Sequence, residues 1–342
     1  MVLTTDLTTD LTTAHCFTAY TYAKFISVQT VLTTSPAEAA QIIKNGGIVA
    51  FPTETVYGLG ANVFDEKAIA KIFIAKRRPN DNPLIAHVSS LEQVETLASE
   101  INQTAREFID AFFPGPLTLV LPKADDVPLI ATAGLDTVGV RMPRNEIAQR
   151  FLRECETSLV APSANLSGKP SPTRWEAVYE DLNGRIDCIL QGETTEIGLE
   201  STVVDCTGAV PIILRQGAVT LEDLRELVPE TKDSVGFEGS APKSPGLKHR
   251  HYSPSAKVIL VSDVPSFEFE NSRAAFIGIT KPQVEFDSIK ICESVEDYGR
   301  SLFNFFRACD RAGIDRIYCE QVSRTGLGAA VMDRIERASS LI

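Results

Sequence analysis

The sequence predicts an α/β protein that contains a mixed sheet and a second, smaller α/β domain at its C-terminal end. From Ser35 onward, short apolar or β-branched runs bounded by Pro, Gly, Asn or Ser alternate with amphipathic helical stretches. A segment rich in Gly, Pro, Ser and Lys at residues 231–255 interrupts this alternation, which then resumes. A chain of 342 residues is long enough for two domains.

The first two helices of the globular part carry clear start signals. Ser35 is placed as the N-cap of a helix with Pro36 at its first position, and Gly46 and Gly47 end it. Asp65 is placed as the cap of a second helix, residues 66–76, with an apolar stripe along one face. Lys76 continues that stripe in the last turn, so we expect it to emerge where the buried face meets a cleft.

The remaining elements follow from short buried runs. Expected strands lie within residues 48–53, 83–88, 117–122, 137–143, 158–163, 188–192 and 201–207, and expected helices within 145–154 and 173–184. In the trailing part, strands are expected within 256–263, 274–280 and 316–322, with a helix within 297–313. We therefore divide the chain into an extension at 1–30 that we expect to be disordered, a large α/β domain at 31–230, a linker or long functional loop at 231–255, and a C-terminal domain at 256–342.

Composition excludes several classes of protein. The formal net charge of -12 argues against bulk attraction to nucleic acid or anionic lipid, although a local basic pocket remains compatible with it. No apolar run approaches the roughly 20 residues of a membrane span. The seven cysteines are scattered singly, which favours reduced thiols in a cytoplasmic protein, and their spacing with the four histidines supports no protein-held metal site. The N-terminal residues fit neither a secretory signal nor a mitochondrial presequence.

Three consecutive cations, Lys76, Arg77 and Arg78, stand out in this acidic chain. Cations in the last turn of a helix complement its dipole, and most such groups are solvated. The prolines at 79 and 83 favour a different reading, because a stiff loop lowers the entropy cost of holding a cationic fork in place. A Lys beside a planar Arg suits a triphosphate.

Other polar segments are ambiguous when taken singly. His87, on an apolar strand, is either a satisfied core residue or a ligand-binding one. The hydroxyl-rich segments "FPTETVYGLG" and "APSANLSGKPSPT" follow buried strands, where hydroxyls also form turns. Ser201 begins an expected strand and Arg215 ends another. The chain contains no Walker loop, no GxGxxG after a strand and no GxSxG, so any nucleotide must be held by another arrangement.

Taken together and in order, eight segments closely resemble the YrdC-like threonylcarbamoyl-AMP synthases in their long, two-domain form. They are "FPTETVYGLG", "AKRRPNDNPLIAHV", "FFPGPLTLVL", "TVGVRMP", "APSANLSGKPSPT", "GLESTVVD", "ILRQGAV" and "SPGLKHRHYSP". The resemblance covers residues of about 36 to 255, and "GLGAAVMDRIERAS" in the trailing domain fits the long form. It implies a twisted open mixed sheet around a basic concave cavity, with a small Rossmann-like second domain.

The resemblance also implies an activity. That family condenses L-threonine, bicarbonate and ATP, with Mg²⁺ carried by the nucleotide, to L-threonylcarbamoyladenylate and pyrophosphate. A separate transferase complex then modifies the tRNA adenosine beside the anticodon, so direct tRNA binding is expected to be weak or absent. An RNA-binding module with a basic concave surface and a carbamoyl-transfer enzyme with another acceptor are the alternatives. The net charge disfavours the first, and the absence of an acylphosphatase-like segment or zinc-finger cysteines disfavours the second.

The resemblance assigns roles to individual positions. Lys76 and Arg78 are the expected catalytic pair on the ATP phosphates. A lid from the linker is expected to close over the cleft. The expected L-threonine site is Thr53, His87, Arg141, Ala161 and Ser201, with Arg141 forked onto the carboxylate, and the other nucleotide positions are Thr137, Ser163, Asn165, Ser171, Arg215, His249, His251 and Tyr252.

Overall fold

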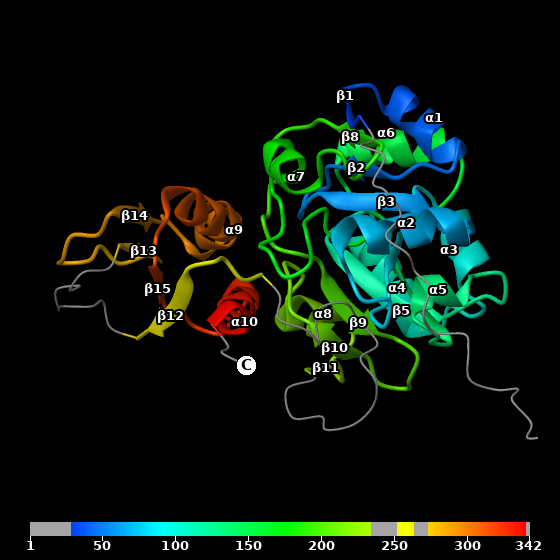
Figure 1. The fold of residues 1–342 in the computed structure, drawn as a ribbon. Helices are drawn as coiled ribbons and strands as arrows, with labels where there is room; N and C mark the ends of the chain where they lie inside the picture. Colours follow the sequence, from blue (N-terminus) through cyan, green and yellow to red (C-terminus); the bar gives the residue numbers. More distant parts are fainter. Residues whose placement is uncertain (1–28, 234–251, 263–272, 340–342) are drawn as a thin grey trace, which may run out of the picture.

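A computed structural model describes residues 29–233, 252–262 and 273–339, which form two α/β domains side by side (Figure 1). The expectation of an extension at 1–30 falls almost entirely outside the described residues. Most of the expected lid, including His249 and His251, also lies outside them.

The larger domain is built on one mixed sheet of eleven strands. Parallel and antiparallel pairs alternate irregularly across it. In spatial order the strands are β1 (Val31–Thr33), β8 (Cys188–Leu190), β2 (Val49–Phe51), β3 (Gly58–Asn62), β7 (Leu159–Val160), β4 (Ile85–His87), β6 (Thr137–Arg141), β5 (Leu117–Pro122), β9 (Thr202–Asp205), β10 (Ile212–Arg215) and β11 (Lys232–Asp233). The predicted mixed sheet is confirmed, and β11 extends it into the segment that the sequence assigned to the linker.

Helices cover this sheet and begin where their caps predict. Ser35 accepts a hydrogen bond from the Glu38 amide, and Asp65 accepts from the amides of residues 67 and 68, so both predicted N-caps are confirmed. The helices are α1 (Pro36–Lys44), α2 (Glu66–Lys76), α3 (Leu91–Leu97), α4 (Gln103–Phe112), α5 (Leu129–Thr132), α6 (Glu146–Cys155), α7 (Trp175–Leu182) and α8 (Leu221–Leu227).

The sheet order brings distant segments to one place. β4 and β6 run parallel with His87 opposite Arg141, so both side chains sit at the same carboxyl-terminal edge. β7 lies antiparallel on the other side of β4, and the amide of Ala161 donates to the carbonyl of Ile85 at 2.8 Å. Arg141 therefore lies beside His87, and Ala161 lies beside Ile85, two residues back along β4. Segments 54 and 76 positions apart in the chain thus meet on one face of the sheet.

The C-terminal domain has a smaller sheet in which all pairs are parallel. Its order is β12 (Lys257–Val261), β15 (Arg316–Glu320), β13 (Ala274–Gly278) and β14 (Ser288–Ile291), with helices α9 (Val295–Ala312) and α10 (Leu327–Ser339). The predicted second α/β domain is confirmed. None of the helices in the described part of the chain is both long and apolar enough to cross a membrane.

Both helices of the smaller domain lie on the side that faces the larger one (Figure 1). Arg307 of α9 pairs with Asp181 of α7 at 2.8 Å, and Arg334 of α10 pairs with Glu200 at 2.8 Å. All four side chains are at most 8% exposed. The two domains are therefore joined by charged groups that are withdrawn from solvent.

Candidate functional site

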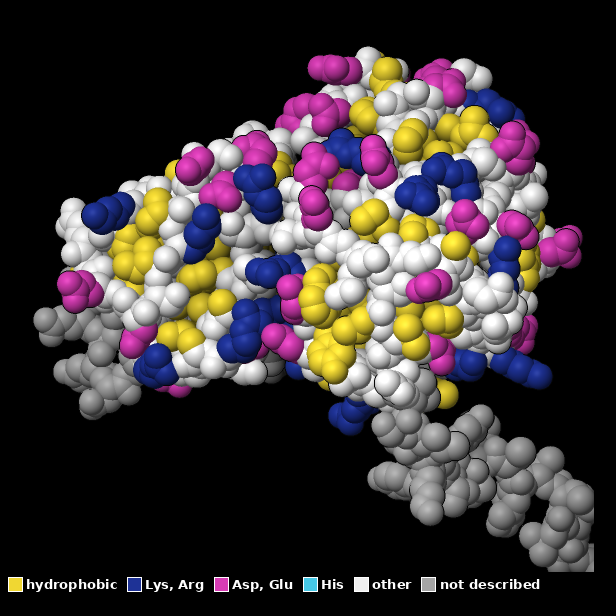
Figure 2. Space-filling model, turned by 90° about the horizontal axis from the view of Figure 1, so that it is seen from above, with side chains coloured by type: hydrophobic (Ala, Val, Ile, Leu, Met, Phe, Trp, Pro, Cys, Tyr) yellow, Lys and Arg dark blue, Asp and Glu magenta, His cyan; other side chains and the backbone are white. Residues whose placement is uncertain are grey.

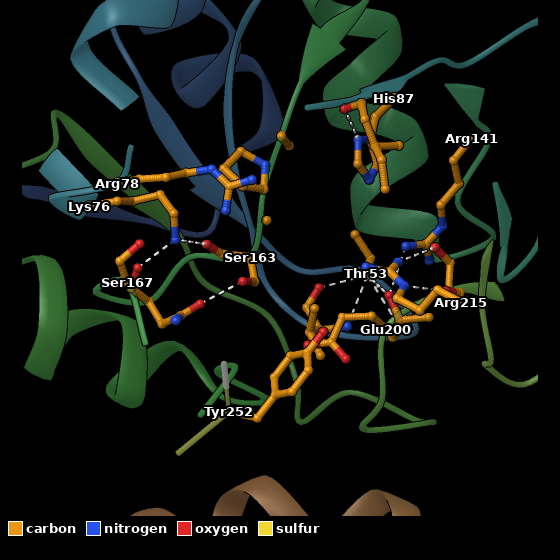
Figure 3. Close-up of a pocket in the computed structure, with 18 of the residues that line it drawn as sticks. Thr53, Lys76, Arg78, His87, Arg141, Ser163, Ser167, Glu200, Arg215 and Tyr252 are labelled. Carbon is orange, nitrogen blue, oxygen red and sulfur yellow. Dashed lines mark hydrogen bonds between the residues drawn. The ribbon is translucent and has the colours of Figure 1, made fainter. Parts of the chain in front are cut away.

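A cavity opens where the loops after β2, β7 and the ends of α2, β4, β6 and β10 meet. Figure 3 shows two groups of cations on its walls: Lys76 and Arg78 lie on one side, and Arg141 and Arg215 on the other. Most of the residues predicted from the sequence line it, namely Thr53, Lys76, Arg78, His87, Arg141, Ala161, Ser163, Asn165, Ser201, Arg215 and Tyr252.

Lys76 is 1% exposed although it carries an ammonium group. Its Nζ donates to the carbonyls of Ser163 at 2.5 Å and Asn165 at 2.6 Å, which leaves one of its three N–H bonds for a ligand. Burial first, and then the neighbouring Arg78, hold the pKa of Lys76 well below its ordinary value. An anion placed beside it would offset this cost, so the position favours a negatively charged ligand.

Arg78 completes this side of the cavity. Its Nη2 donates to the carbonyls of Asn82 at 3.3 Å and Pro83 at 3.4 Å, and its buried Nε has no partner among the described residues. Burial lowers the pKa of Arg78 to about 10. Arg77 adopts a left-handed conformation (φ 52°) and its side chain is exposed, so only two of the three consecutive cations reach the cavity.

A loop after β7 closes the same side. The Ser163 hydroxyl donates to Oδ1 of Asn165 at 2.6 Å, and Nδ2 of Asn165 donates to the carbonyl of Lys169 at 2.9 Å. The amide of Ser167 donates to the carbonyl of Lys76 at 2.9 Å. The end of α2 and this loop are therefore held as one unit, in which the polar groups order each other.

His87 is buried and also lines the cavity, so it is at once a core residue and a residue that can contact a ligand. Its Nδ1 lies 3.1 Å from the carbonyl of Ile85, and its ring meets Phe51 edge-on. Burial, followed by the charge of Arg141, lowers the pKa of His87 to about 3. The imidazole is therefore neutral near pH 7, and it offers shape and one hydrogen bond rather than charge.

Arg141 is fixed on three sides. Its Nη2 pairs with Oε1 of Glu54 at 2.7 Å, Nη1 donates to Oγ1 of Thr55 at 2.8 Å, and Nε donates to the carbonyl of Gly115 at 3.4 Å. Each terminal nitrogen keeps one further N–H, which is the fork that a carboxylate accepts. The sequence did not single out Glu54, because an acid in a strand-end loop gives no sign of its partner 87 positions away.

Two predicted hydroxyls are engaged within the protein. The Thr53 hydroxyl donates to the carbonyl of Val56 at 2.7 Å and accepts from the Thr55 amide at 3.1 Å, so it shapes its own turn. The Ser201 hydroxyl lies 2.8 Å from that of Thr118 and accepts from Nη2 of Arg215 at 3.0 Å. Both hydroxyls, which the sequence assigned to the threonine site, are therefore already held by hydrogen bonds within the protein.

Glu200 is a lining residue that the sequence did not single out. It is 6% exposed and is the acidic side chain among the lining residues. Its neighbour Ser201 was chosen from the same motif, but the acid could not be assigned, because its cationic partner comes from the other domain.

Two further predicted positions do not line this cavity. Thr137 begins β6, whereas Arg141 ends that strand about 13 Å away at about 3.3 Å per residue. Ser171 is 1% exposed and donates to Oε1 of Glu200, so it contacts a lining residue without lining the cavity itself.

Comparison with known proteins identifies the family to which the chain belongs. A family model for Sua5, YciO and YrdC proteins, described as Telomere recombination, matches residues 41–217. A second model, described as the C-terminal domain of threonylcarbamoyl-AMP synthase, matches residues 219–340. The chain is 46% identical over 316 residues to a threonylcarbamoyl-AMP synthase of Pyrococcus abyssi, covering 88% of this chain and 93% of the relative. The chain belongs to the threonylcarbamoyl-AMP synthase family.

Two further relatives agree with this membership. The threonylcarbamoyl-AMP synthase of Bacillus subtilis is 37% identical over 334 residues, covering 92% of this chain and 96% of that protein. A crystal structure of P. abyssi Sua5 complexed with L-threonine superimposes with a TM-score of 0.84 at 44% identity, covering 91% of this chain and 97% of the other. The predicted resemblance, fold and nucleotidyltransferase class of this threonylcarbamoyl-AMP synthase family member are confirmed.

Proposed function

We propose that the chain condenses L-threonine, bicarbonate and ATP to L-threonylcarbamoyladenylate and pyrophosphate. The observation that carries this proposal is a single cavity with one cationic pair on each side, Lys76 with Arg78 and Arg141 with Arg215 (Figure 3). Lys76 and Arg78 suit a polyphosphate and Arg141 suits an amino-acid carboxylate, while Arg215 stays a proposed nucleotide ligand beside Arg141. The relatives named as threonylcarbamoyl-AMP synthases, and the Sua5 structure that holds L-threonine, support it.

Arg141 is the proposed ligand of the threonine carboxylate. Glu54, Thr55 and Gly115 hold the guanidinium, and each terminal nitrogen keeps one further N–H for the ligand. His87 and Ala161 supply adjacent walls, and the neutral imidazole adds no charge that would compete with Arg141. These residues order the amino acid before any reaction.

The proposed chemistry has two steps. The threonine amine adds to bicarbonate and water is lost, which gives an N–COO⁻ carbamate. A carbamate oxygen then attacks the α-phosphorus of ATP, the bond to the β-phosphate oxygen breaks, and pyrophosphate leaves. Negative charge grows on phosphoryl oxygens in the second step, where the remaining N–H of Lys76 and the Arg78 guanidinium can stabilise it.

The residues fit Mg²⁺ only as a companion of the nucleotide. Among the described residues no three His, Cys, Asp or Glu side chains are grouped to hold a metal ion. Glu200, the acid in the cavity wall, is already paired with Arg334. Mg²⁺ commonly keeps its waters and binds through substrate phosphates, where it would neutralise charge on the triphosphate.

Transfer of the threonylcarbamoyl group to tRNA is proposed to be the task of a separate transferase complex. On the face shown in Figure 2, acidic and basic side chains are interspersed over both domains. Together with the net charge of -12, this supports weak or absent direct tRNA binding. It also disfavours the RNA-binding alternative.

The test is pyrophosphate release from ATP and Mg²⁺ with L-threonine and bicarbonate supplied together and each omitted in turn. Release that requires both, with L-serine a clearly poorer substrate, is the expected result. Mass spectrometry of the product should show the adenylate. Release that is indifferent to threonine would reject the proposed substrate, and direct tRNA binding without release would favour the RNA-binding module.

A further inference from the structure

Arg334 of α10 is the largest fully buried side chain in the described part of the protein, and it comes from the domain that does not contain the cavity. Its Nε pairs with Oε2 of Glu200 at 2.8 Å, and its Nη2 donates to the carbonyl of Gln216 at 2.9 Å. Its guanidinium carbon lies 5.3 Å from the centroid of the Tyr252 ring. One side chain thus spans three segments of the cavity wall.

Glu200 connects Arg334 to the residues on the ligand side of the cavity. One carboxylate oxygen takes the Arg334 bond and the other accepts from the Ser171 hydroxyl. The next residue, Ser201, accepts from Arg215 through both its carbonyl and its hydroxyl at 3.0 Å. Since Arg334 holds Glu200 before β9 and Gln216 after β10, it fixes the two chain segments that carry Ser201 and Arg215.

Arg307 makes a parallel connection from α9. Its Nη2 donates to the carbonyl of Pro170 at 2.6 Å and to Asp181 at 2.8 Å, and it is 6% exposed. Asp181 also pairs with Lys169 at 2.9 Å. The loop that contains Ser167 and Gly168 of the cavity is therefore tied to the C-terminal domain as well.

We propose that Arg334 is a positioning residue for the reaction, which acts through Glu200 to hold Ser171, Ser201 and Arg215 in place. The C-terminal domain then completes the active site rather than serving as an independent module. This inference rests on the proposed function for its activity assay.

A buried ion pair is by itself weak support for stability, because replacing both partners by neutral groups of similar volume is often neutral. Removal of one partner is different, since it leaves an uncompensated charge. Asp333 lies near Tyr252, and with Arg334 gone, Glu200 faces Arg215, Tyr252 and the Ser171 hydroxyl. Its carboxylate would then draw Arg215 away from Ser201 or take up a proton.

The variants that test this are Arg334→Met, Arg334→Lys, Glu200→Gln and the double variant Glu200→Gln with Arg334→Met. The matched control is Arg311→Ala, which removes an interdomain pair with Glu180 whose side chains are 52% and 45% exposed. We expect Arg334→Met to lower kcat/KM about 100-fold, the usual scale for a misplaced site. Arg334→Lys should retain part of the rate, since one ammonium can pair with Glu200 without reaching Gln216. Arg311→Ala should match the wild type.

The double variant separates positioning from folding. We expect it to melt near the wild-type temperature, yet to remain about 100-fold impaired. In Arg334→Met alone, loss of the Arg334 charge that helps to lower the pKa of Glu200 should raise this pKa and add a pH dependence of the activity that the double variant lacks. Wild-type activity in the double variant, or equal activity of Arg334→Met and Arg311→Ala, would overturn the inference.

Calorimetric titration with ATP keeps the two proposals distinguishable. If the wild type binds ATP but shows no threonine-dependent release, the proposed function fails while the affinity of the variants still tests Arg334. Weaker ATP binding by the double variant than by Arg311→Ala supports positioning, and equal binding rejects it. Should Arg334→Met fail to fold, Glu200→Gln and the double variant decide in the same way.

Discussion

The Glu54–Arg141 pair gives the sharpest quantitative prediction. Their side chains are 2% and 5% exposed, and Nη2 of Arg141 lies 2.7 Å from Oε1 of Glu54. At an effective dielectric constant of about 20, charges 2.7 Å apart attract by about 6 kcal/mol, from which desolvation is subtracted. Glu54→Ala leaves Arg141 buried without a counter-charge, so we expect the free energy of unfolding to fall by about 3–5 kcal/mol.

A surface pair of nearly the same length is the control. Arg144 and Glu196 are 2.6 Å apart, but their side chains are 43% and 64% exposed. Glu196→Ala should therefore change the free energy of unfolding by no more than about 1 kcal/mol. Urea denaturation of both variants measures the difference, and equal losses would refute the reasoning from burial.

The same substitution should affect one substrate selectively. Without Glu54, Nη2 of Arg141 loses its anchor, so the KM for L-threonine should rise at least about 10-fold, while the KM for ATP changes little. Glu54→Gln keeps an acceptor for Arg141 and should have the smaller effect on both stability and KM. A larger rise in the KM for ATP than for threonine would contradict the assignment of Arg141 to the amino acid.

Three further predictions follow from single positions. Lys76→Met should lower kcat/KM for ATP about 100-fold, whereas Lys71→Met, which removes an exposed bond to the Gly46 carbonyl, should not; equal effects would count against a phosphate role. Burial holds the pKa of His87 at about 3 in the folded chain against 6.5 in the unfolded one, so the free energy of unfolding falls as the pH drops from about 6.5 to 3. His87→Gln should lessen this loss in melting curves taken across that range. A Cβ at Gly217 would lie 2.2 Å from the first backbone nitrogen of β9, so Gly217→Ala should lower the free energy of unfolding by about 1–3 kcal/mol and disturb the cavity. Gly208→Ala is the control in the same urea assay and should be tolerated, because its nearest contact would be at 3.8 Å.

Local features of the chain could be predicted from the sequence because their causes are local. The caps at Ser35 and Asp65 depend on side chains two or three residues from the amides that they bind. The buried position of Lys76 follows from the helical period of α2. The strands β5, β6 and β9 follow from short apolar runs that end at turn-forming residues.

Other features could be recognised only in the three-dimensional structure. The edge strand β14 was not expected, because its residues alternate between exposed and half-buried without a strong apolar run. Arg77 could not be separated from its two neighbours until its left-handed conformation turned it outward. The motifs indicated a cavity lined by Lys76 and Arg141. Only the backbone conformation of Arg77 decided that this third cation does not reach the cavity.

The sequence by itself determined the α/β class, the caps and the set of motifs from which most of the cavity is built. The tertiary structure alone decided the partners of the charges, since these pairs join residues 87, 126 and 134 positions apart: Arg141 with Glu54, Arg307 with Asp181, and Arg334 with Glu200. A buried charge must find its partner in space, and the spatial neighbour is set by strand order and domain packing rather than by spacing along the chain.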